Sequence, residues 1–555
     1  MNAESNASPR KYAVALIGCI SGVAVAATGP ATNCNVGYLQ GTVSSATHLS
    51  AASIVAATAT TPEYCRVDGT IHTPTSQALT FAVGLPTSWN DKFVMLTQGG
   101  FAGAVPNPAG NSGVAASPPP LSKGYATAST DTGHRGGAFD ASFLIGRPDL
   151  SIDFGHRGNK LTVDTAKALM KGYYQADPKR SLLVGCSNGG RSTMIHSQRY
   201  PNDFDGYVVG APAWDWPGML GLDFHHSNAS FFSNAGAWMS PAKVKLLSDA
   251  VLAACDLKDG VKDGLIEEPR ACTFNPASLI CTSGDSDSCL TVTQVAAVKK
   301  YAADMKNSHG DVLSPPWLLN GDEAAGMTQW KLGATPPPIG VDGKPAPVYP
   351  TLSAPNAAQA FSFIFENGAV GWQTFDNPNW SWKNWDLDQE VGALAQTDGI
   401  ASALDTNVMP TVSRGAKFLI YHGWGDQALN PLRTIEYYNG VVAKFGKSKT
   451  DTFLRVFMVP GMQHCSGGTN ATDRFDPIDQ LEKWLDSEKA PDIIVASHVT
   501  SGTVTHTRPL CAYPKVARFN YGPGAEPFFD PAFWQSLKND WRNFTCVDPS
   551  ATGGG

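Results

Sequence analysis

A serine enclosed by glycines is the residue best placed for chemistry in this chain. Ser187 stands in Gly185-Cys186-Ser187-Asn188-Gly189, after the apolar run 182–184 and before a segment with helical spacing. A sharp turn between strand and helix strains the serine and exposes its hydroxyl, and the glycines are needed because a Cβ there would collide with neighbouring backbone. The N–H groups of the helix can stabilise a developing oxyanion. The pattern predicts a nucleophile, and the alternative is a glycine-rich turn with an incidental serine.

A nucleophilic serine needs a base and a carboxylate. Asp426 follows the strand-like run 416–421, and His464 follows the run 454–459. In the α/β-hydrolase fold the three residues occur in the order Ser, Asp or Glu, His, each just after a strand. We therefore predict that His464 takes the proton of Ser187, while Asp426 holds the imidazole tautomer and stabilises the imidazolium.

Two later histidines are weaker alternatives for the base, and two cysteines favour His464. His498 and His506 lie in polar stretches rich in Thr and Ser. Cys186 directly precedes the serine, whereas Cys465 directly follows His464. If serine and base are neighbours, these cysteines are close enough for a disulfide, which needs Cα atoms roughly 4.4–6.8 Å apart. The alternative is a pair of free buried thiols.

The oxyanion hole needs two backbone donors. One is the N–H of Asn188, directly after the nucleophile. The other is expected in the loop 97–101, where Gly100 is the first choice and Gly99 the second. A plain tight turn is the alternative explanation of this glycine pair.

The elements around these residues alternate strands with helices. Between about 79 and 197 we predict strands at 80–85, 93–96, 125–129 and 182–184, and a helix over 161–174. Such alternation indicates a mostly parallel sheet covered on both faces. After 211 the chain becomes loop-rich until sheet patterning returns at 416. We predict an α/β-hydrolase fold with a large inserted lid, divided into a signal peptide (1–27), the first part of the catalytic domain (28–211), the lid domain (212–404) and the second part of the catalytic domain (405–555).

Composition restricts the class of protein. The 555 residues carry 41 basic and 48 acidic side chains, a net charge of −7 with no basic block, which argues against nucleic acid as a partner. The N-terminus has Arg10 and Lys11 before the uncharged apolar stretch 12–27, which is typical of a signal peptide. We expect a secreted or periplasmic protein without a membrane span, and a lipid anchor on Cys19 is a minor alternative.

The cysteines and a cluster of aspartates indicate disulfides and calcium. Ten of the 11 cysteines remain after Cys19, an even number typical of disulfides in an exported chain, and none has zinc-site spacing. Three carboxylates lie between residues 255 and 265, with two glycines, and oxygen ligands in a short loop suit Ca²⁺. The expected ligands are the side chains of Asp256, Asp259 and Asp263 and the carbonyls of Val261 and Leu265. Cys255 and Cys272 would bracket this loop as a disulfide, and a solvated acidic turn is the alternative reading of the aspartates.

Taken together, these motifs resemble the tannase and feruloyl esterase family. The likeness rests on Gly-Cys-Ser-x-Gly-Gly-Arg at 185–191, on Tyr421-His422-Gly423-Trp424-x-Asp426 and on His464-Cys465. It implies a serine carboxylesterase with a structural lid calcium at the ligands named above and no organic cofactor. It also implies the disulfides Cys186–Cys465, Cys255–Cys272 and Cys281–Cys289, and we expect Cys34–Cys65 and Cys511–Cys546 for the remaining cysteines.

The substrate is expected to be an ester of an aromatic, phenolic acid such as ferulate. The lid is rich in aromatic residues between Phe361 and Trp385, which suits a flat acyl group. Enzymes of this family that cleave terephthalate monoesters use a lid arginine for the carboxylate, and no arginine lies between Arg270 and Arg414. The alternatives are a tannase for galloyl esters, a terephthalate monoester hydrolase and, from another class, a non-catalytic binding protein on a hydrolase scaffold. A peptidase is disfavoured because nothing resembles a propeller or a clamp for peptide termini.

Overall fold

A computed structural model describes residues 31–335 and 360–549, apart from positions 76, 112, 116 and 523. The predicted signal peptide and the alternative anchor Cys19 lie outside the described residues.

The described residues build a nine-stranded sheet in the order β1-β2-β3-β5-β4-β6-β7-β10-β11. The strands are β1 (Thr47–Val55), β2 (Tyr64–Ile71), β3 (Leu79–Pro86), β4 (Lys92–Leu96), β5 (Ala126–Thr130), β6 (Arg180–Cys186), β7 (Gly206–Gly210), β10 (Lys417–Gly423) and β11 (Leu454–Val459). Neighbours from β1 to β5 pair antiparallel, and all neighbours from β5 to β11 pair parallel. The strands predicted from the sequence are confirmed, and the mixed sheet has the predicted α/β-hydrolase architecture.

Helices cover both faces of the parallel part of the sheet. On β6, Leu182 and Val184 pack in the cluster that includes Leu481 of α14 (Pro477–Ser487), whereas Leu183 packs in the cluster on the opposite face. That second face is covered by α3 (Gly158–Tyr174), α4 (Asn188–Arg199) and α12 (Pro431–Phe445), with the short α1 (Val36–Leu39). The short helices α2 (Pro148–Ile152) and α13 (Lys447–Thr450) come before α3 and after α12 in the chain. Because successive strand residues point to opposite faces, near-continuous apolar strands are what a sheet covered on both sides requires.

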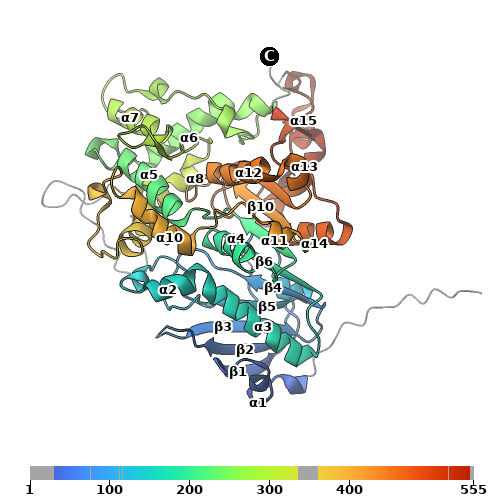
Figure 1. Cartoon of the computed structure of the whole chain (residues 1–555). Coiled ribbons are helices and arrows are strands. Elements are labelled where there is room, and N and C mark those ends of the chain that lie inside the picture. Colours follow the sequence, from blue (N-terminus) through green and yellow to red (C-terminus); the bar gives the residue numbers. More distant parts are fainter. Residues whose placement is uncertain are drawn as a thin grey trace, which may run out of the picture.

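The segment between β7 and β10 is more helical than its composition suggested. It contains α5 (Phe224–Phe231), α6 (Pro241–Cys255), α7 (Val292–Tyr301), α8 (Glu323–Met327), α9 (Phe361–Glu366), α10 (Leu394–Ala401) and α11 (Met409–Val412), the π-helical turn η6 (Gly218–Asp223) and the hairpin β8 (Met305–Lys306) and β9 (Val312–Ser314). Side-chain caps explain several helix starts, since Ser240 caps α6 and Thr291 forms a capping box with Gln294 at α7. In Figure 1 the green to yellow helices α5–α8 gather at the end of the molecule opposite β1–β3. The domain boundaries at 212 and 404 stay predictions.

The chain ends in two hairpins and a helix beyond the sheet. These are β12 (Ile493–Thr500) with β13 (Thr503–Cys511), β14 (Val516–Phe519) with β15 (Phe544–Val547), and α15 (Pro531–Lys538). Within the described ranges, none of the helices combines the length and apolar character needed to cross a bilayer.

Candidate active site

Ser187 occupies the predicted strained turn between β6 and α4. Its φ of 65° and ψ of −128° lie in a region that residues other than glycine rarely adopt. A Cβ at Gly185 would lie 2.6 Å from the carbonyl carbon of Gly189, so only glycine fits there. A Cβ at Gly189 would lie 3.0 Å from the carbonyl oxygen of Thr97, which is also tight. The turn therefore holds the Ser187 hydroxyl at the carboxyl end of the parallel strands, beside the first N–H groups of α4.

His464 and Asp426 meet at the same edge of the sheet. Nδ1 of His464 lies 2.8 Å from Oδ2 of Asp426, and His464 lines a pocket together with Ser187. Asp426 is 1% exposed, and its Oδ1 accepts the backbone N–H groups of Ala428 and Leu429 at 2.8 and 2.9 Å. Burial by itself would raise the pKa of Asp426. The charge of His464 and the hydrogen bonds from His422 and His464 outweigh burial and hold this pKa well below its usual value. The carboxylate is thus ionised and oriented toward the imidazole.

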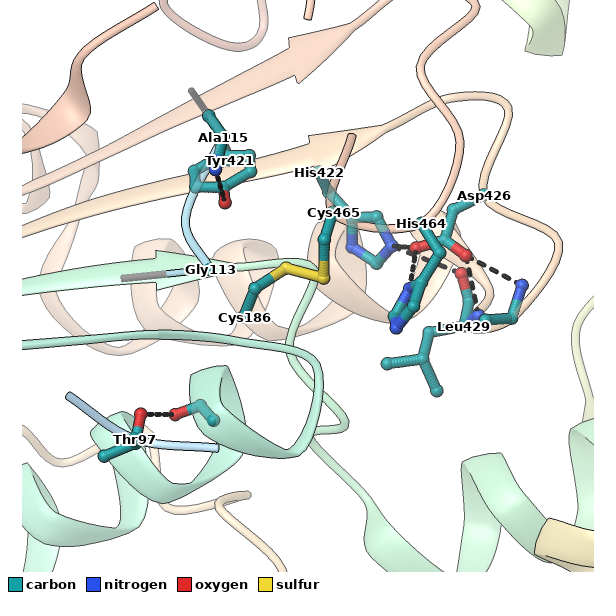
Figure 2. Close-up of a disulfide and its surroundings, with 12 residues drawn as sticks. Thr97, Gly113, Ala115, Cys186, Tyr421, His422, Asp426, Leu429, His464 and Cys465 are labelled. Atoms are coloured by element: carbon teal, nitrogen blue, oxygen red, sulfur yellow. Dashed lines mark hydrogen bonds and ion pairs between the residues drawn. A yellow bond between two sulfur atoms is a disulfide. The ribbon is translucent and has the colours of Figure 1, made fainter. Parts of the chain in front are cut away.

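A second histidine supports the same carboxylate and was not assigned a role from the sequence. Nε2 of His422, in β10, lies 3.1 Å from Oδ2 of Asp426, and its Nδ1 lies 2.7 Å from the hydroxyl of Thr434. Figure 2 shows both imidazoles reaching Asp426 from different sides. With Thr434 donating to Nδ1, the His422 tautomer with a proton on Nε2 donates to Asp426. The only sequence signal was its place in the Tyr-His-Gly-Trp motif.

The two alternative bases lie in the β12–β13 hairpin, where they contact each other and backbone carbonyl oxygens. His498 and His506 face each other across β12 and β13, with ring centroids 4.9 Å apart. Nδ1 of His498 lies 2.8 Å from the carbonyl oxygen of Ala471, and Nε2 of His506 lies 2.9 Å from that of Asn470. These contacts give both rings a structural role in holding the hairpin, which leaves His464 as the candidate base.

All five expected disulfides are present. Cys186 and Cys465 are bonded with their Cα atoms 6.0 Å apart, as Figure 2 shows beside His464. The others are Cys34–Cys65, Cys255–Cys272, Cys281–Cys289 and Cys511–Cys546. The Cys186–Cys465 bond joins the residue before the serine to the residue after the histidine, across 279 positions of sequence. It therefore ties two loops whose relative position the chemistry depends on.

Removing this bond is expected to impair both activity and stability. In a Cys186→Ala, Cys465→Ala double variant, kcat/KM for a p-nitrophenyl ester should fall by about 10- to 100-fold, because a shift near 1 Å in catalytic geometry has that effect. Thermal unfolding should occur at lower temperature, since a native disulfide typically contributes about 2–5 kcal/mol. The matched control is Cys281→Ala, Cys289→Ala, which removes a disulfide between cysteines only eight positions apart. Equal loss of kcat/KM in both double variants would show that the bond has no special role at the site.

The two residues predicted to donate N–H groups to the oxyanion lie beside Ser187. Gly100 and Asn188 line the same pocket as Ser187. Gly100 has φ 57°, and a Cβ on it would lie 2.8 Å from the Cβ of Ala138, so the loop requires glycine. Gly99, the second choice, has its Cβ position 3.8 Å from the Cβ of Ser187. Both glycines are close enough to remain candidates, and Gly100 is the one that borders the inner pocket.

A buried arginine connects the nucleophile turn to the oxyanion loop, which the sequence reasoning missed. Nε of Arg191 donates to Oδ1 of Asn188 at 2.7 Å, and Nδ2 of Asn188 donates to the carbonyl oxygen of Gln98 at 3.1 Å. Arg191 also donates to the carbonyl oxygen of Ala401 at 2.7 Å. Burial, with the nearby charge of Arg199, lowers the pKa of Arg191 to about 9. The position of Arg191 in the motif at 185–191 was the sequence signal that could have identified it. Its carbonyl acceptors could not be predicted, because they belong to segments distant in the sequence.

Two adjoining pockets open at the serine. The inner pocket is lined by Gly100, Ser187, Asn188, Ala213, Trp216, Leu220, Phe224, Trp330, Phe365, Ala428, Leu429 and His464. The outer pocket is wider and shares Gly100, Ser187, Trp330, Phe365 and His464, to which it adds Thr97, Gln98, Pro106, Asn111 and Phe139 among others. Of the aromatic residues between Phe361 and Trp385, Phe365 lines these pockets, whereas Trp385 packs in a separate cluster. Trp216 and Trp330 were not anticipated.

The aspartate-rich loop packs against Arg508 of β13. Asp263 forms an ion pair with the buried Arg508 guanidinium, and Oδ2 of Asp259 lies 4.0 Å from its Nη2. Asp256 accepts the backbone N–H groups of Asp263 and Gly264, each at 3.1 Å. Over the described ranges, no group of three or more His, Cys, Asp or Glu side chains is arranged to hold a metal ion. Oδ2 of Asp259 is nevertheless buried without a hydrogen-bond partner, an orphaned oxygen that a cation would satisfy.

Comparison with known proteins gives a consistent result. A family model described as tannase and feruloyl esterase matches residues 65–526. An uncharacterized esterase of Xanthomonas campestris is 31% identical, with 91% of this chain and 89% of that protein covered. A mono(2-hydroxyethyl) terephthalate hydrolase of Piscinibacter sakaiensis is 30% identical, with 90% and 87% covered. The crystal structure of feruloyl esterase B from Aspergillus oryzae shares the fold, with a TM-score of 0.77 and 23% identity over 93% of this chain and 100% of that one.

Proposed function

Because the chain belongs to the tannase and feruloyl esterase family of carboxylic ester hydrolases, we propose that it cleaves esters of aromatic acids through an acyl-enzyme on Ser187. The observation that carries this proposal is the contact between His464 and the buried Asp426, in a pocket that His464 shares with Ser187.

The reaction follows from the positions of these groups. His464 accepts the proton of Ser187 as its oxygen attacks the ester carbonyl, while Asp426 stabilises the imidazolium. The N–H groups of Gly100 and Asn188 stabilise the oxyanion. The tetrahedral intermediate collapses, the ester C–O bond breaks, and His464 returns the proton to the leaving alcohol. Water, deprotonated by His464, then attacks the acyl-enzyme and releases the acid.

We propose a phenolic acid such as ferulate as the acyl group. A tannase for galloyl esters and a hydrolase for terephthalate monoesters are the alternatives within this chemistry. Hydrolysis of methyl ferulate, methyl gallate and mono(2-hydroxyethyl) terephthalate should be compared, and methyl ferulate should have the highest kcat/KM. A higher kcat/KM for either of the others would reassign the substrate. A non-catalytic binding protein would hydrolyse none of the three.

We also propose that the lid loop holds a structural Ca²⁺. Carboxylates of Asp256, Asp259 and Asp263, with carbonyls of Val261 and Leu265, would be its ligands. The support is the donor set itself: three carboxylates lie in one short loop beside Arg508, and Oδ2 of Asp259 is buried without a hydrogen-bond partner. Such a site suits a hard divalent cation.

Calcium removal should lower thermal stability. Treatment with EDTA should lower the Tm by several degrees, because a ligand at about 100 times its Kd contributes roughly 2.7 kcal/mol. Adding Ca²⁺ should restore the Tm, and Asp259→Asn should abolish this response. Asp249→Asn, at an exposed position in α6, is the matched control and should keep it. An unchanged wild-type Tm with and without EDTA would contradict the calcium proposal.

We propose export to an oxidising compartment, secreted or periplasmic. The five disulfides support this, since such bonds persist outside the reducing cytosol. The N-terminal signal pattern agrees, and lipid attachment at Cys19 is the minor alternative. The mass of the exported protein would distinguish cleavage near residue 27 from lipidation.

A further inference from the structure

Helix α8, in the segment between β7 and β10, lies against the turn that carries the base. Its N-cap residue Asp322 is 7% exposed and accepts hydrogen bonds from two groups of Thr469, the backbone N–H at 3.0 Å and the side-chain hydroxyl. Nε2 of Gln463 donates to the carbonyl oxygen of Asp322 at 3.1 Å and to its Oδ2 at 3.3 Å. One aspartate therefore holds both ends of the stretch 463–469, in which His464 is the second residue.

The stretch 463–469 also closes on itself between these two contacts. The N–H of Gln463 donates to the carbonyl oxygen of Gly467 at 3.1 Å. This bond fixes the backbone of Gln463, and Asp322 fixes its side chain, so contacts on both sides set the direction in which His464 leaves the turn. An imidazole must lie within hydrogen-bond reach of the serine oxygen to accept its proton, and this direction therefore matters for catalysis.

Gly326 brings α8 into direct contact with two residues that adjoin the catalytic pair. A Cβ at Gly326 would lie 2.1 Å from Oε1 of Gln463 and 2.9 Å from Cγ of Gln427. Gln463 precedes His464, and Gln427 follows Asp426. The Gln463 amide cannot swing aside without losing the two hydrogen bonds of its Nε2. The close approach of the helix therefore requires glycine at this position.

The loop of the carboxylate is held from the same segment. Oε1 of Gln427 accepts the hydroxyl of the buried Tyr301, at the end of α7, at 2.7 Å. The N–H of Gly425 donates to the carbonyl oxygen of Met462 at 3.0 Å, which joins the carboxylate loop to the base loop. A shift of one loop is thus passed to the other.

The continuation of α8 reaches the base itself. The π-helical turn η11 (Thr328–Leu332) follows α8 without a break and carries Trp330. The ring centroid of Trp330 lies 5.3 Å from that of His464, at an interplanar angle of 75°. One helical segment, 323–332, therefore contacts the imidazole, the residue before it and the residue after the carboxylate.

We infer that Asp322 and Gly326 act through Gln463 as positioning residues of the catalytic base. They fix the loop of His464 at the distance from the serine that proton transfer requires. This role rests on the proposed esterase function. Neither residue belongs to the described lining of the pockets at Ser187, so neither acts on the substrate directly. A displacement near 1 Å at the base should lower kcat by about 10- to 100-fold, with a smaller change in KM.

The first test replaces Gly326 by alanine. Alanine is a better helix former than glycine, so the helix should persist while the added Cβ displaces Gln463 and Gln427. We expect kcat for a p-nitrophenyl ester, measured well below the Tm, to fall by about tenfold or more. Gly399→Ala is the matched control and should retain wild-type kcat, because Gly399 lies in α10 where an added Cβ would meet open space.

A second substitution shows whether the effect passes through Gln463. Gln463→Ala removes the amide that the new Cβ would meet. In this background, adding Gly326→Ala should lower kcat by about threefold or less, because the two substitutions share one contact and their effects are not additive. The same fold-loss from Gly326→Ala in both backgrounds would place its effect elsewhere and overturn the inference.

Asp322 is tested by a conservative and a disruptive variant. In Asp322→Asn, the amide oxygen can accept from Gln463 and from the N–H of Thr469, while the amide nitrogen can donate to the Thr469 hydroxyl, so kcat should stay close to that of the wild type. Asp322→Ala removes these bonds and should lower kcat by about tenfold or more.

Asp205→Ala controls for a general loss of stability. Oδ2 of Asp205 accepts the N–H of Ser181 at 2.8 Å, at the amino end of β6 and thus at the opposite end of the strand from Ser187. This variant should lower the Tm and leave kcat unchanged. The Asp322 variants and this control decide the question even if Gly326→Ala does not fold.

The outcomes separate this inference from the proposed function. Wild-type kcat in folded Gly326→Ala or in folded Asp322→Ala overturns the positioning role alone, and so does a fall in Tm without a fall in kcat. An equal fall of kcat in the control variants overturns it as well. No turnover of any ester by the wild type, p-nitrophenyl acetate included, overturns both proposals.

Discussion

Replacing Ser187 by alanine is expected to lower kcat/KM for an aromatic ester by about 10⁴-fold or more, because the acyl-enzyme can no longer form. The substitution removes only the hydroxyl group. Because alanine keeps the Cβ, the backbone turn should stay the same. The Tm should therefore stay close to that of the wild type. Initial rates with a p-nitrophenyl ester and thermal unfolding of both proteins measure the two effects.

The exposed Ser278, in the segment between β7 and β10, provides the control for this substitution. Ser278→Ala should leave both kcat/KM and Tm unchanged. If Ser187→Ala kept more than about a tenth of the wild-type kcat/KM while folded, the nucleophile would have to be another group and the acyl-enzyme mechanism would be wrong.

Asp426→Asn should have the second largest effect, a fall in kcat/KM of about 10³- to 10⁴-fold. The Oδ1 atom of asparagine can still accept the N–H groups of Ala428 and Leu429, so the loop should keep its shape. Its amide would point N–H donors at His464, in place of the oxygen that now lies 2.8 Å from Nδ1. The imidazole would then favour the tautomer with its proton on Nε2, and this tautomer cannot accept the proton of Ser187.

The exposed Asp405 is a matched position for this experiment. Asp405→Asn should retain wild-type kcat/KM. Retention of more than about a tenth of the activity by Asp426→Asn would contradict the assignment of the carboxylate. His422 would then need testing, since it contacts the same oxygen from the other side.

The sequence by itself determined the features that depend on local sterics and periodicity. The Ser187 turn is readable because only glycine tolerates the close approach at Gly185. The strands β6, β10 and β11 are readable because strands buried on both faces are continuous apolar runs. Once the strands were placed, chain order restricted the carboxylate and the base to Asp426 and His464.

Tertiary structure alone decided which distant side chains complete the site. His422 supports Asp426 because β10 packs against Thr434 of α12, and Arg191 finds its acceptor in Ala401. The inner pocket joins Trp216, Trp330 and Phe365 from separate segments between β7 and β10. Side chains so far apart in the chain meet only through packing, which no local pattern encodes. Packing likewise placed Arg508 beside Asp259 and Asp263, although each of these residues was visible in the sequence.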